Sequence, residues 1–247
     1  MTLQQFFEEN ARVALGFSGG VDSAFLLSAA LRYGAQVRPY YIQTVFQPEF
    51  EQQDARRLCQ ELGVELHVIP LDILAQEQVR KNPSDRCYYC KRILFSALKE
   101  QALADGFPVL IDGTNASDDA GDRPGMRALG ELSVRSPLRE CNLSKTQVRE
   151  LSRKAGLFTW DKPAYACLAT RIPAGRELTP EELSRVEQAE DFLFRLGFTD
   201  FRVRVPEGRA LLQMPEEQLP LALEKRREIL SVLGELFPAV ALDLKPR

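Results

Sequence analysis

The sequence has little histidine, few cysteines and no long hydrophobic run, and each shortage excludes a class of protein. The single histidine, His67, leaves too little material for a histidine-rich zinc centre or a Ser-His-Asp triad. Five cysteines are an odd and sparse set, which favours intracellular thiols or metal ligands over a disulfide scaffold. No window approaches about 18 uninterrupted apolar residues, so we expect no membrane span.

Charge and length narrow the classes further. The first ten residues are acidic and lack the apolar core of a secretory signal, so we expect a cytoplasmic location. The chain carries 32 Lys and Arg against 35 Asp and Glu, and this mild acidity argues against a protein held to nucleic acid by charge. With 247 residues, 45% of them hydrophobic, the chain can bury a core in one or two domains.

The first two-thirds of the chain alternate between strand and helix patterns. Short apolar runs predict strands over 12–17, 37–42, 64–69 and 108–112. Apolar residues at helical spacing, or capping signals, predict helices over 22–33, 49–62, 85–104 and 144–155. This alternation predicts an α/β fold with a parallel sheet and helices on both faces. Residues 113–140 show little periodicity and are predicted to form a long polar loop.

The pattern changes after residue 172. Thr179-Pro-Glu-Glu182 is a strong helix start and predicts a helix over 179–196. The remaining expectations are a hairpin of 201–205 with 210–213, a helix over 216–236 and a strand over 239–244. We therefore predict a small C-terminal α+β domain of residues 173–247, which follows a parallel-sheet domain of residues 1–172.

One motif is typical of a phosphate-binding loop. Ser18-Gly-Gly-Val-Asp-Ser23 follows the first predicted strand and opens the first predicted helix. The two glycines allow close approach of a ligand, and successive N–H groups at the helix N-terminus form an anion cradle. The motif lacks the lysine of a Walker P-loop and the Rossmann glycine spacing. It resembles the PP-loop of the ATP pyrophosphatase superfamily, whose enzymes transfer AMP from ATP to an oxygen and release pyrophosphate.

This resemblance implies a set of nucleotide-binding residues. The loop residues implied to hold ATP and Mg²⁺ are Ser18, Gly19, Gly20, Asp22 and Ser23. Asp22 is the candidate partner of the metal, directly or through water. Gly113 lies in Asp112-Gly-Thr-Asn115, just after a predicted strand, where it would let the chain pass close to the nucleotide.

A second constellation consists of cysteines. Arg86-Cys-Tyr-Tyr-Cys-Lys91 contains a C-x₂-C pair, and Cys167 stands far downstream. The pair alone leaves open a redox dithiol, half a zinc site or cluster ligands. A closed zinc site normally needs four protein ligands, and the remaining candidates stand in ordinary settings. A helical pair with one distant cysteine suits a three-ligand [4Fe–4S] cluster with one open iron.

Four further segments indicate one family within this superfamily. They are Asn82-Pro-Ser-Asp-Arg-Cys-Tyr-Tyr-Cys-Lys91, Asp122-Arg-Pro-Gly125, Ala166-Cys-Leu-Ala-Thr-Arg-Ile-Pro-Ala-Gly175 and Arg202-Val-Arg204. Together they resemble LarE proteins, the sulfur-inserting enzymes of nickel-pincer nucleotide biosynthesis, and the resemblance extends to Leu242-Asp-Leu244. It implies adenylation of the carboxylates of pyridinium-3,5-biscarboxylic acid mononucleotide and replacement of oxygen by sulfur. The bisthiocarboxylate product later binds nickel in lactate racemase.

The resemblance also implies a sulfur source. Some LarE proteins have one cysteine, at the position of Cys167, and sacrifice its sulfur to leave dehydroalanine. This sequence adds Cys87 and Cys90, so it is similar to the branch whose three cysteines hold a [4Fe–4S] cluster with a sulfide on its open iron. Sacrificial donation from Cys167 stays the alternative.

Roles for further side chains follow from the same resemblance. The implied catalytic residues are Cys167, Asp22 and Glu190, and the implied substrate-binding residues are Thr170, Arg171, Arg202, Arg204 and Asp243. Arginine grips phosphate and carboxylate bidentately. Arg202 and Arg204 share one face of a short predicted strand, which is costly unless an anion lies there.

Three rival functions remain at this stage. A tRNA thiolase also uses a PP-loop and cysteine but needs a basic RNA surface. An amidating ligase of the NAD or GMP synthetase type gives the cysteines no role, and an ATP sensor or iron–sulfur carrier would be inactive. The expected partners are a small nucleotide substrate, a sulfide donor and other enzymes of the pincer pathway. We expect a homo-oligomer, with no nucleic acid and no membrane.

Overall fold

The computed structural model describes residues 1–118 and 124–247 and divides the chain into two compact units. Unit 1 consists of Met1–Thr44, Glu49–Ile73 and Asp85–Lys162. Unit 2 consists of Val45–Pro48, Leu74–Ser84 and Pro163–Arg247. Two short segments from the first third of the sequence thus belong to the C-terminal unit. The assignment of residues 1–172 and 173–247 as functional domains stays a prediction.

Unit 1 is built on a four-stranded sheet in the order β3-β2-β1-β4. Its strands are β1 (Arg12–Gly16), β2 (Gln36–Gln43), β3 (His67–Pro70) and β4 (Val109–Ile111). Every pairing in the sheet is parallel. The structure therefore confirms the α/β fold with a parallel sheet that the alternating sequence pattern predicts.

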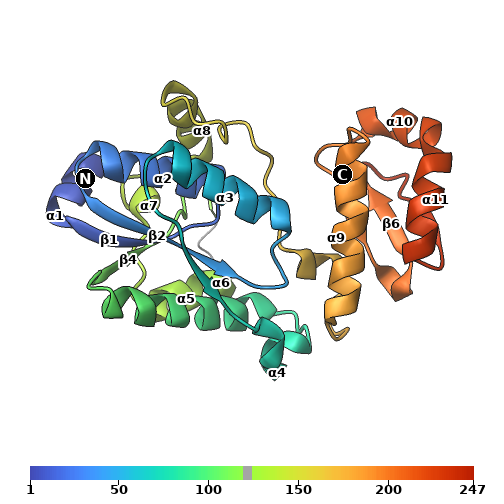
Figure 1. The fold of residues 1–247 in the computed structure, drawn as a ribbon, viewed down its shortest axis with the longest axis horizontal. Coiled ribbons are helices and arrows are strands. Elements are labelled where there is room, and N and C mark those ends of the chain that lie inside the picture. Colours follow the sequence, from blue (N-terminus) through green and yellow to red (C-terminus); the bar gives the residue numbers. More distant parts are fainter. Residues whose placement is uncertain (119–123) are drawn as a thin grey trace. The chain divides into compact units, whose positions relative to one another are not determined.

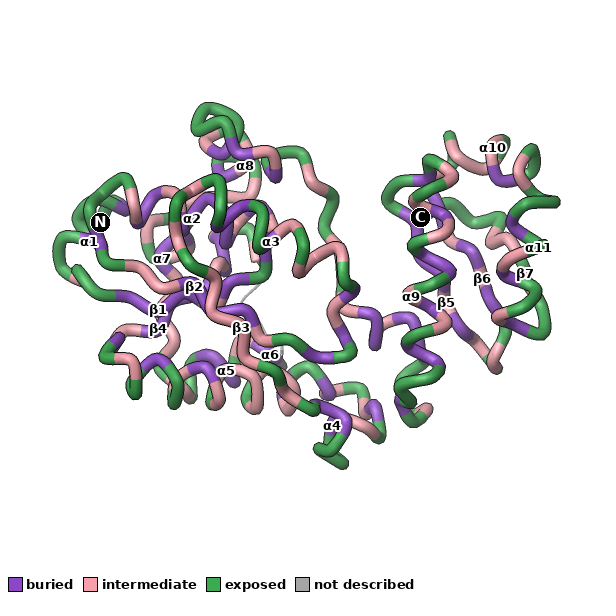
Figure 2. The backbone as a smooth tube through the Cα atoms, viewed as in Figure 1, coloured by how far each residue is buried: buried purple, intermediate pink, exposed green. Residues whose placement is uncertain are grey.

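Helices cover both faces of this sheet (Figure 1). Helices α2 (Val21–Arg32) and α3 (Glu49–Glu61) lie on one face and α5 (Arg86–Ala104) on the other. Successive residues of β1 point to opposite faces, so Val13 joins the core beside α2 and Ala14 joins the core beside α5. Figure 2 shows the resulting burial of the strands at the centre of unit 1. Burial on both faces explains why β1 is a continuous apolar run.

The other helices of unit 1 differ in how well the sequence predicts them. They are α1 (Leu3–Glu9), α6 (Pro124–Glu131), α7 (Pro137–Glu140) and α8 (Lys145–Lys154). Helix α8 begins with the predicted capping box, in which the Ser144 hydroxyl accepts from the Gln147 N–H and the Gln147 side chain accepts from the Ser144 N–H. The prediction of a loop over 113–140 is wrong for α6 and α7, which are too short to show a clear apolar period.

Unit 2 has a three-stranded sheet in the order β5-β6-β7. Its strands are β5 (Arg202–Arg204), β6 (Ala210–Gln213) and β7 (Val240–Leu242), and its longer helices are α9 (Pro180–Arg195), α10 (Leu219–Glu224) and α11 (Arg226–Leu236). Strands β5 and β6 form the predicted antiparallel hairpin, and β7 pairs parallel to β6. Thr179 is the N-cap residue of α9 as predicted, and its hydroxyl accepts from the Glu182 N–H.

The single helix predicted over 216–236 is wrong in detail. A 3₁₀ turn at Glu216–Gln218 precedes α10, and Lys225 separates α10 from α11. Pro220 lies in the first turn of α10, where its missing N–H costs no helical hydrogen bond. The 3₁₀ turn η1 (Ile73–Ala75) spans a boundary between the two units, and the short helix α4 (Glu77–Arg80) belongs to unit 2. In the described part of the chain, no helix combines the length and hydropathy that crossing a membrane requires.

The strand order of unit 1 marks one place for a ligand. Strand β1 lies between β2 and β4. The two strands that follow β1 in the chain lie on one side of it, and β4 lies on the other side. Open parallel sheets bind ligands at such a switch point, outside the carboxyl ends of the strands. The loops that follow β1 and β4 meet at this position.

Candidate functional site

The loop after β1 leads into a helix whose first backbone N–H groups are available to an anion. Gly19 has φ of +70°, and a Cβ there would lie 3.1 Å from the backbone nitrogen of Ala55. Gly20 is the N-cap residue of α2 and provides no side-chain cap. The first N–H groups of this 12-residue helix therefore lack the partner that a serine or aspartate cap would supply. This geometry suits a phosphate group.

The two serines of the motif hold the loop together. The hydroxyl oxygens of Ser18 and Ser23 lie 3.1 Å apart, and Ser23 Oγ donates to the Gly20 carbonyl at 3.2 Å. The Gly20 N–H in turn donates to Ser18 Oγ at 3.3 Å. Both hydroxyls therefore shape the cradle, in addition to any contact with a ligand.

The loop after β4 packs against the start of α2. A Cβ at Gly113 would lie 2.9 Å from the backbone nitrogen of Ser23 and 3.2 Å from the Asp22 Cβ, so only glycine lets the loop pass. Asp112 is buried and accepts from Thr114 Oγ1 at 2.5 Å and from Ser136 Oγ at 2.6 Å. The structure thus brings the predicted Gly113 beside the PP-loop helix.

A lysine that the sequence analysis missed completes this part of the site. Lys145 Nζ lies 2.5 Å from Asp22 Oδ2, and Asn115 Nδ2 donates to Asp22 Oδ1 at 3.3 Å. The Lys145 backbone N–H also donates to Ser117 Oγ at 2.9 Å, which ties α8 to the loop after β4. The capping box at Ser144 was the available signal, because it fixes Lys145 as the first residue of a helix.

The charges of this site suit a nucleotide with its magnesium. No group of three or more His, Cys, Asp or Glu side chains among the described residues is placed to hold a metal ion. Mg²⁺ is commonly held by only one or two carboxylates together with substrate phosphates, so Asp22 alone is an adequate protein contribution. Lys145 and the start of α2 add positive charge beside it.

Unit 2 contains a buried ion pair at the predicted substrate residues. Arg171 Nε donates to Glu190 Oε1 at 2.8 Å, and Arg171 Nη2 donates to Glu190 Oε2 at 2.9 Å. The exposed fractions of the two side chains are 0% and 2%. Glu190 Oε1 also accepts from the Val203 N–H at 2.8 Å, and Tyr165 donates its hydroxyl to Oε2. The carboxylate therefore fixes η2 (Leu168–Arg171), α9 and β5 together.

The arginines also hold the segment that carries Cys167. Arg171 Nη1 donates to the Ala166 carbonyl at 2.7 Å, and Arg202 Nη2 donates to the Ala164 carbonyl at 2.7 Å. Thr170 Oγ1 donates to the Cys167 carbonyl at 2.8 Å. Arg171 and Thr170, which the resemblance assigns to substrate binding, thus donate hydrogen bonds to backbone carbonyls at and next to Cys167.

Positive charge exceeds negative charge around β5. Burial, together with the charges of Arg171 and Arg247, lowers the pKa of Arg202 to about 10. Burial and the same two arginines lower the pKa of Arg204. Arg204 donates to the Thr170 carbonyl and to Gln213 Oε1, which are uncharged acceptors. A bound anion would relieve this repulsion.

Asp243 is connected to this cluster through an amide. Gln213 Nε2 donates to Asp243 Oδ2 at 2.8 Å, and Gln213 Oε1 accepts from Arg204 Nε at 3.1 Å. The hydrogen bond from Gln213, followed by that from the Lys245 backbone, lowers the pKa of Asp243. The carboxylate stays ionised and orients Gln213.

The cysteines fall in both units. Cys87 and Cys90 lie near the start of α5 in unit 1, three residues apart and therefore on one face of the helix. Cys167 directly precedes η2 in unit 2. No disulfide joins any of the five cysteines, and burial raises the pKa of Cys59 to about 12, which keeps that thiol neutral. In the predicted segment Asp122-Arg-Pro-Gly125, the first two residues lie outside the described residues.

Comparison with known proteins decides the family. No family profile matches the chain. It is 40% identical over 219 residues to the uncharacterized protein slr1717 of Synechocystis, covering 88% of this chain and 81% of that protein. It is 33% identical over 246 residues to the pyridinium-3,5-bisthiocarboxylic acid mononucleotide synthase of Lactiplantibacillus plantarum, covering 98% of this chain and 89% of the synthase. The chain belongs to the LarE family.

A more distant relative supports the superfamily. The tRNA-specific 2-thiouridylase MnmA of Carboxydothermus hydrogenoformans is 28% identical over 194 residues, which cover 62% of this chain and 53% of MnmA. This LarE protein is thus an ATP-dependent sulfurtransferase with a PP-loop fold. The similarity to the synthase spans both units, whereas the similarity to MnmA covers a smaller share of the chain.

Proposed function

We propose that this LarE protein adenylates the carboxylates of pyridinium-3,5-biscarboxylic acid mononucleotide and replaces one oxygen of each with sulfur. The product would be the bisthiocarboxylate named in its Lactiplantibacillus relative. The observation that carries the proposal is the similarity to that synthase along 98% of the chain, which includes the PP-loop unit and the arginine-rich unit 2.

The first step would occur at the PP-loop. A substrate carboxylate oxygen attacks the α-phosphorus of ATP, the bond to the β-phosphate oxygen breaks, and pyrophosphate leaves. The N–H groups at the start of α2, together with Lys145, would stabilise the charge that develops on the pyrophosphate. Asp22 would hold the Mg²⁺ that neutralises the phosphates, and Gly113 would let the nucleotide lie against the loop.

The second step replaces oxygen by sulfur. A sulfide nucleophile attacks the acyl carbon of the adenylate, and AMP leaves with the original carboxylate oxygen, so each thiocarboxylate formed consumes one ATP. Arg202, Arg204 and Thr170 would bind the phosphate or carboxylate of the substrate, because their cluster carries excess positive charge. Glu190 and Asp243 would position these groups through Arg171 and Gln213.

For the sulfur source we propose a [4Fe–4S] cluster held by Cys87, Cys90 and Cys167. The donor set fits, because thiolates are the usual ligands of such clusters and α5 presents two of them on one face. When bound, the cluster would supply an open iron that carries the sulfide. Sacrificial loss of sulfur from Cys167 is the competing source.

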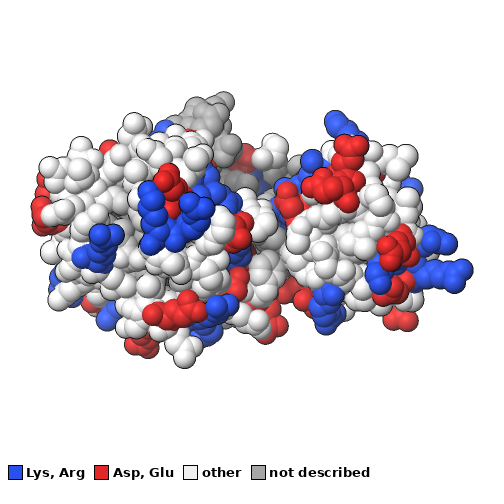
Figure 3. Space-filling view, turned by 90° about the horizontal axis from the view of Figure 1, so that it is seen from above, with Lys and Arg blue, Asp and Glu red and all other residues white. Residues whose placement is uncertain are grey.

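The function is tested by pyrophosphate release from ATP in the presence of sulfide. We expect release that depends on the dicarboxylate mononucleotide and a product whose mass shows one sulfur in place of one oxygen for each carboxylate. Unfractionated tRNA is the matched alternative substrate. Sulfur incorporation into tRNA, with none into the mononucleotide, would assign the chain to the thiolases instead. On the face seen in Figure 3, Lys and Arg lie in separate groups, several of them beside Asp and Glu, rather than as one continuous basic surface.

The sulfur source is tested by metal analysis of protein that is purified and reconstituted without oxygen. We expect about four iron atoms per chain in the parent protein and much less in Cys87→Ala, Cys90→Ala and Cys167→Ala. Cys141→Ala, which changes a cysteine outside the proposed ligand set, should keep its iron. A parent protein without iron that instead loses the mass of H₂S at Cys167 after turnover would establish the sacrificial source.

A further inference from the structure

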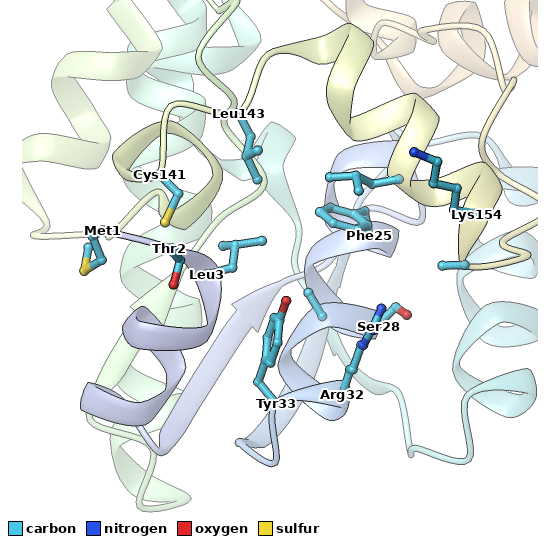
Figure 4. A pocket seen from close by; sticks show the side chains of 13 residues that line it. Met1, Thr2, Leu3, Phe25, Ser28, Arg32, Tyr33, Cys141, Leu143 and Lys154 are labelled. Carbon is cyan, nitrogen blue, oxygen red and sulfur yellow. The ribbon is translucent and has the colours of Figure 1, made fainter.

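A cavity of about 380 Å³ lies in unit 1, away from the PP-loop (Figure 4). It is bounded by the start of α1, the part of α2 from Phe25 to Arg32, the C-terminal half of α8 and the segment after α7. Its lining is mainly apolar, with Leu3, Phe25, Leu143 and Leu151 among the lining residues. The volume is in the range of small-molecule sites, which are mostly apolar with a few placed polar groups.

The charges of the lining have one sign. Arg32 ends α2 and Lys154 ends α8, and the 13 described residues that line the cavity include no Asp or Glu. In the view of Figure 4, both cationic side chains lie on the side opposite Met1 and Cys141. Each helix end contributes about half a negative charge, which the full positive charges of Arg32 and Lys154 exceed. The N-terminal ammonium of Met1, which is close enough to act on Cys141, adds to them.

We propose that this cavity binds a small amphipathic anion, with an apolar body against Phe25 and Leu151 and a carboxylate at Arg32 and Lys154. A neutral apolar ligand would fill the apolar part of the cavity without pairing with Arg32 or Lys154. Burial raises the pKa of Cys141, so its thiol stays neutral and contributes to the apolar wall. One competing carboxylate is present, because Glu150 Oε1 accepts from Lys154 Nζ at 2.7 Å on the exposed surface.

The same two helices join the cavity to the nucleotide site. Helix α2 begins at the PP-loop with Asp22 in its first turn and ends at Arg32, and α8 begins with Lys145 and ends at Lys154. The two helices pack against each other, and their starts are joined by the Asp22–Lys145 pair. A ligand bound between the C-terminal ends of α2 and α8 contacts both helices, so we expect it to change the affinity of the protein for ATP. By linkage, ATP then changes the affinity of the protein for this ligand by the same factor. This coupling rests on the proposed nucleotide site, whereas binding in the cavity does not.

Binding is tested by calorimetric titration of the full chain with octanoate, without ATP or substrate. We expect saturable binding that Arg32→Gln and Lys154→Gln each weaken about two- to fivefold, the loss expected for an ion pair of an exposed side chain. Glu150→Gln should strengthen binding, because it leaves Lys154 to the ligand. Arg153→Gln, at an exposed neighbour that does not line the cavity, is the matched control and should bind as the parent does.

Several results would overturn the proposal. They are absence of saturable binding, equal binding of the neutral isostere octanamide, or parent-like affinity in both Arg32→Gln and Lys154→Gln. Urea unfolding of each variant shows whether the fold is intact, since all four substituted side chains are exposed. A further titration with ATP at saturating octanoate tests the coupling, and an unchanged ATP affinity would refute it while leaving the cavity site established. Failure of sulfur transfer to the mononucleotide would leave these binding results unaffected.

Discussion

Replacing Lys145 by methionine should lower substrate-dependent pyrophosphate release at least about 100-fold. The Lys145 ammonium lies 2.5 Å from the Asp22 carboxylate, at the start of the helix that follows the PP-loop. A preorganised positive group at the site where charge develops is worth about 2.7–4 kcal/mol of transition-state stabilisation. Methionine keeps the length of the side chain and removes the charge, so the loss should fall mainly on kcat.

The measurement is initial pyrophosphate release at saturating ATP and mononucleotide, with kcat and KM determined separately. Lys81→Met is a matched control, because Lys81 also pairs with a carboxylate, Glu77 at 2.6 Å, but on the exposed surface of unit 2. This control should keep its activity within about twofold, as exposed ion pairs contribute little. A folded Lys145→Met enzyme with more than a third of the parent kcat would exclude Lys145 from the chemical step.

The sequence alone could identify the PP-loop but not its lysine. The loop is recognisable because six consecutive residues supply the turn, the helix start and the hydroxyls. Lys145 meets Asp22 only because α8 packs beside α2, and no local pattern encodes a contact between residues 123 positions apart. The role of Gly113 could be predicted, because a glycine after a strand end at a switch point indicates a close backbone approach.

The arginines of unit 2 show the same limit. Strand alternation places Arg202 and Arg204 on one face, and the resemblance adds Arg171 as a further anion ligand. The sequence does not show that Arg171 is completely buried against Glu190, which lies 19 residues further on another element. The start of α10 could have been predicted from Pro220, because proline is favoured in the first turn of a helix. The break at Lys225 lies in the charged run Glu224-Lys-Arg-Arg-Glu228, which also fits the exposed face of a continuous helix, so only the structure reveals it.

Replacing Glu190 by alanine should lower the free energy of unfolding of unit 2 by about 3–5 kcal/mol. The carboxylate is the charge partner of the buried Arg171 and also accepts from Tyr165 and from the Val203 N–H. Without it, Arg171 is left as a buried cation close to Arg202, whose pKa is already lowered by burial and by Arg171. Asp191→Asn, at the neighbouring exposed pair with Arg195, should cost less than about 1 kcal/mol.

The readout must come from unit 2, because the single tryptophan, Trp160, belongs to unit 1 and its fluorescence reports that unit. Hydrogen exchange at the buried Ala210 amide is suitable, since this N–H donates to the Ala239 carbonyl at 2.9 Å within unit 2 and does not contact Glu190. In Glu190→Ala the amide should exchange about 100-fold faster or more, whereas Asp191→Asn should leave it protected.

The double variant Arg171→Met with Glu190→Leu should recover part of the lost stability, because no buried charge then lacks a partner. It should not recover sulfur transfer if Arg171 holds the backbone around Cys167 for the reaction, since the hydrogen bond from Arg171 to the Ala166 carbonyl is lost with the guanidinium. Recovery of both stability and sulfur transfer would show that the buried pair serves the fold alone.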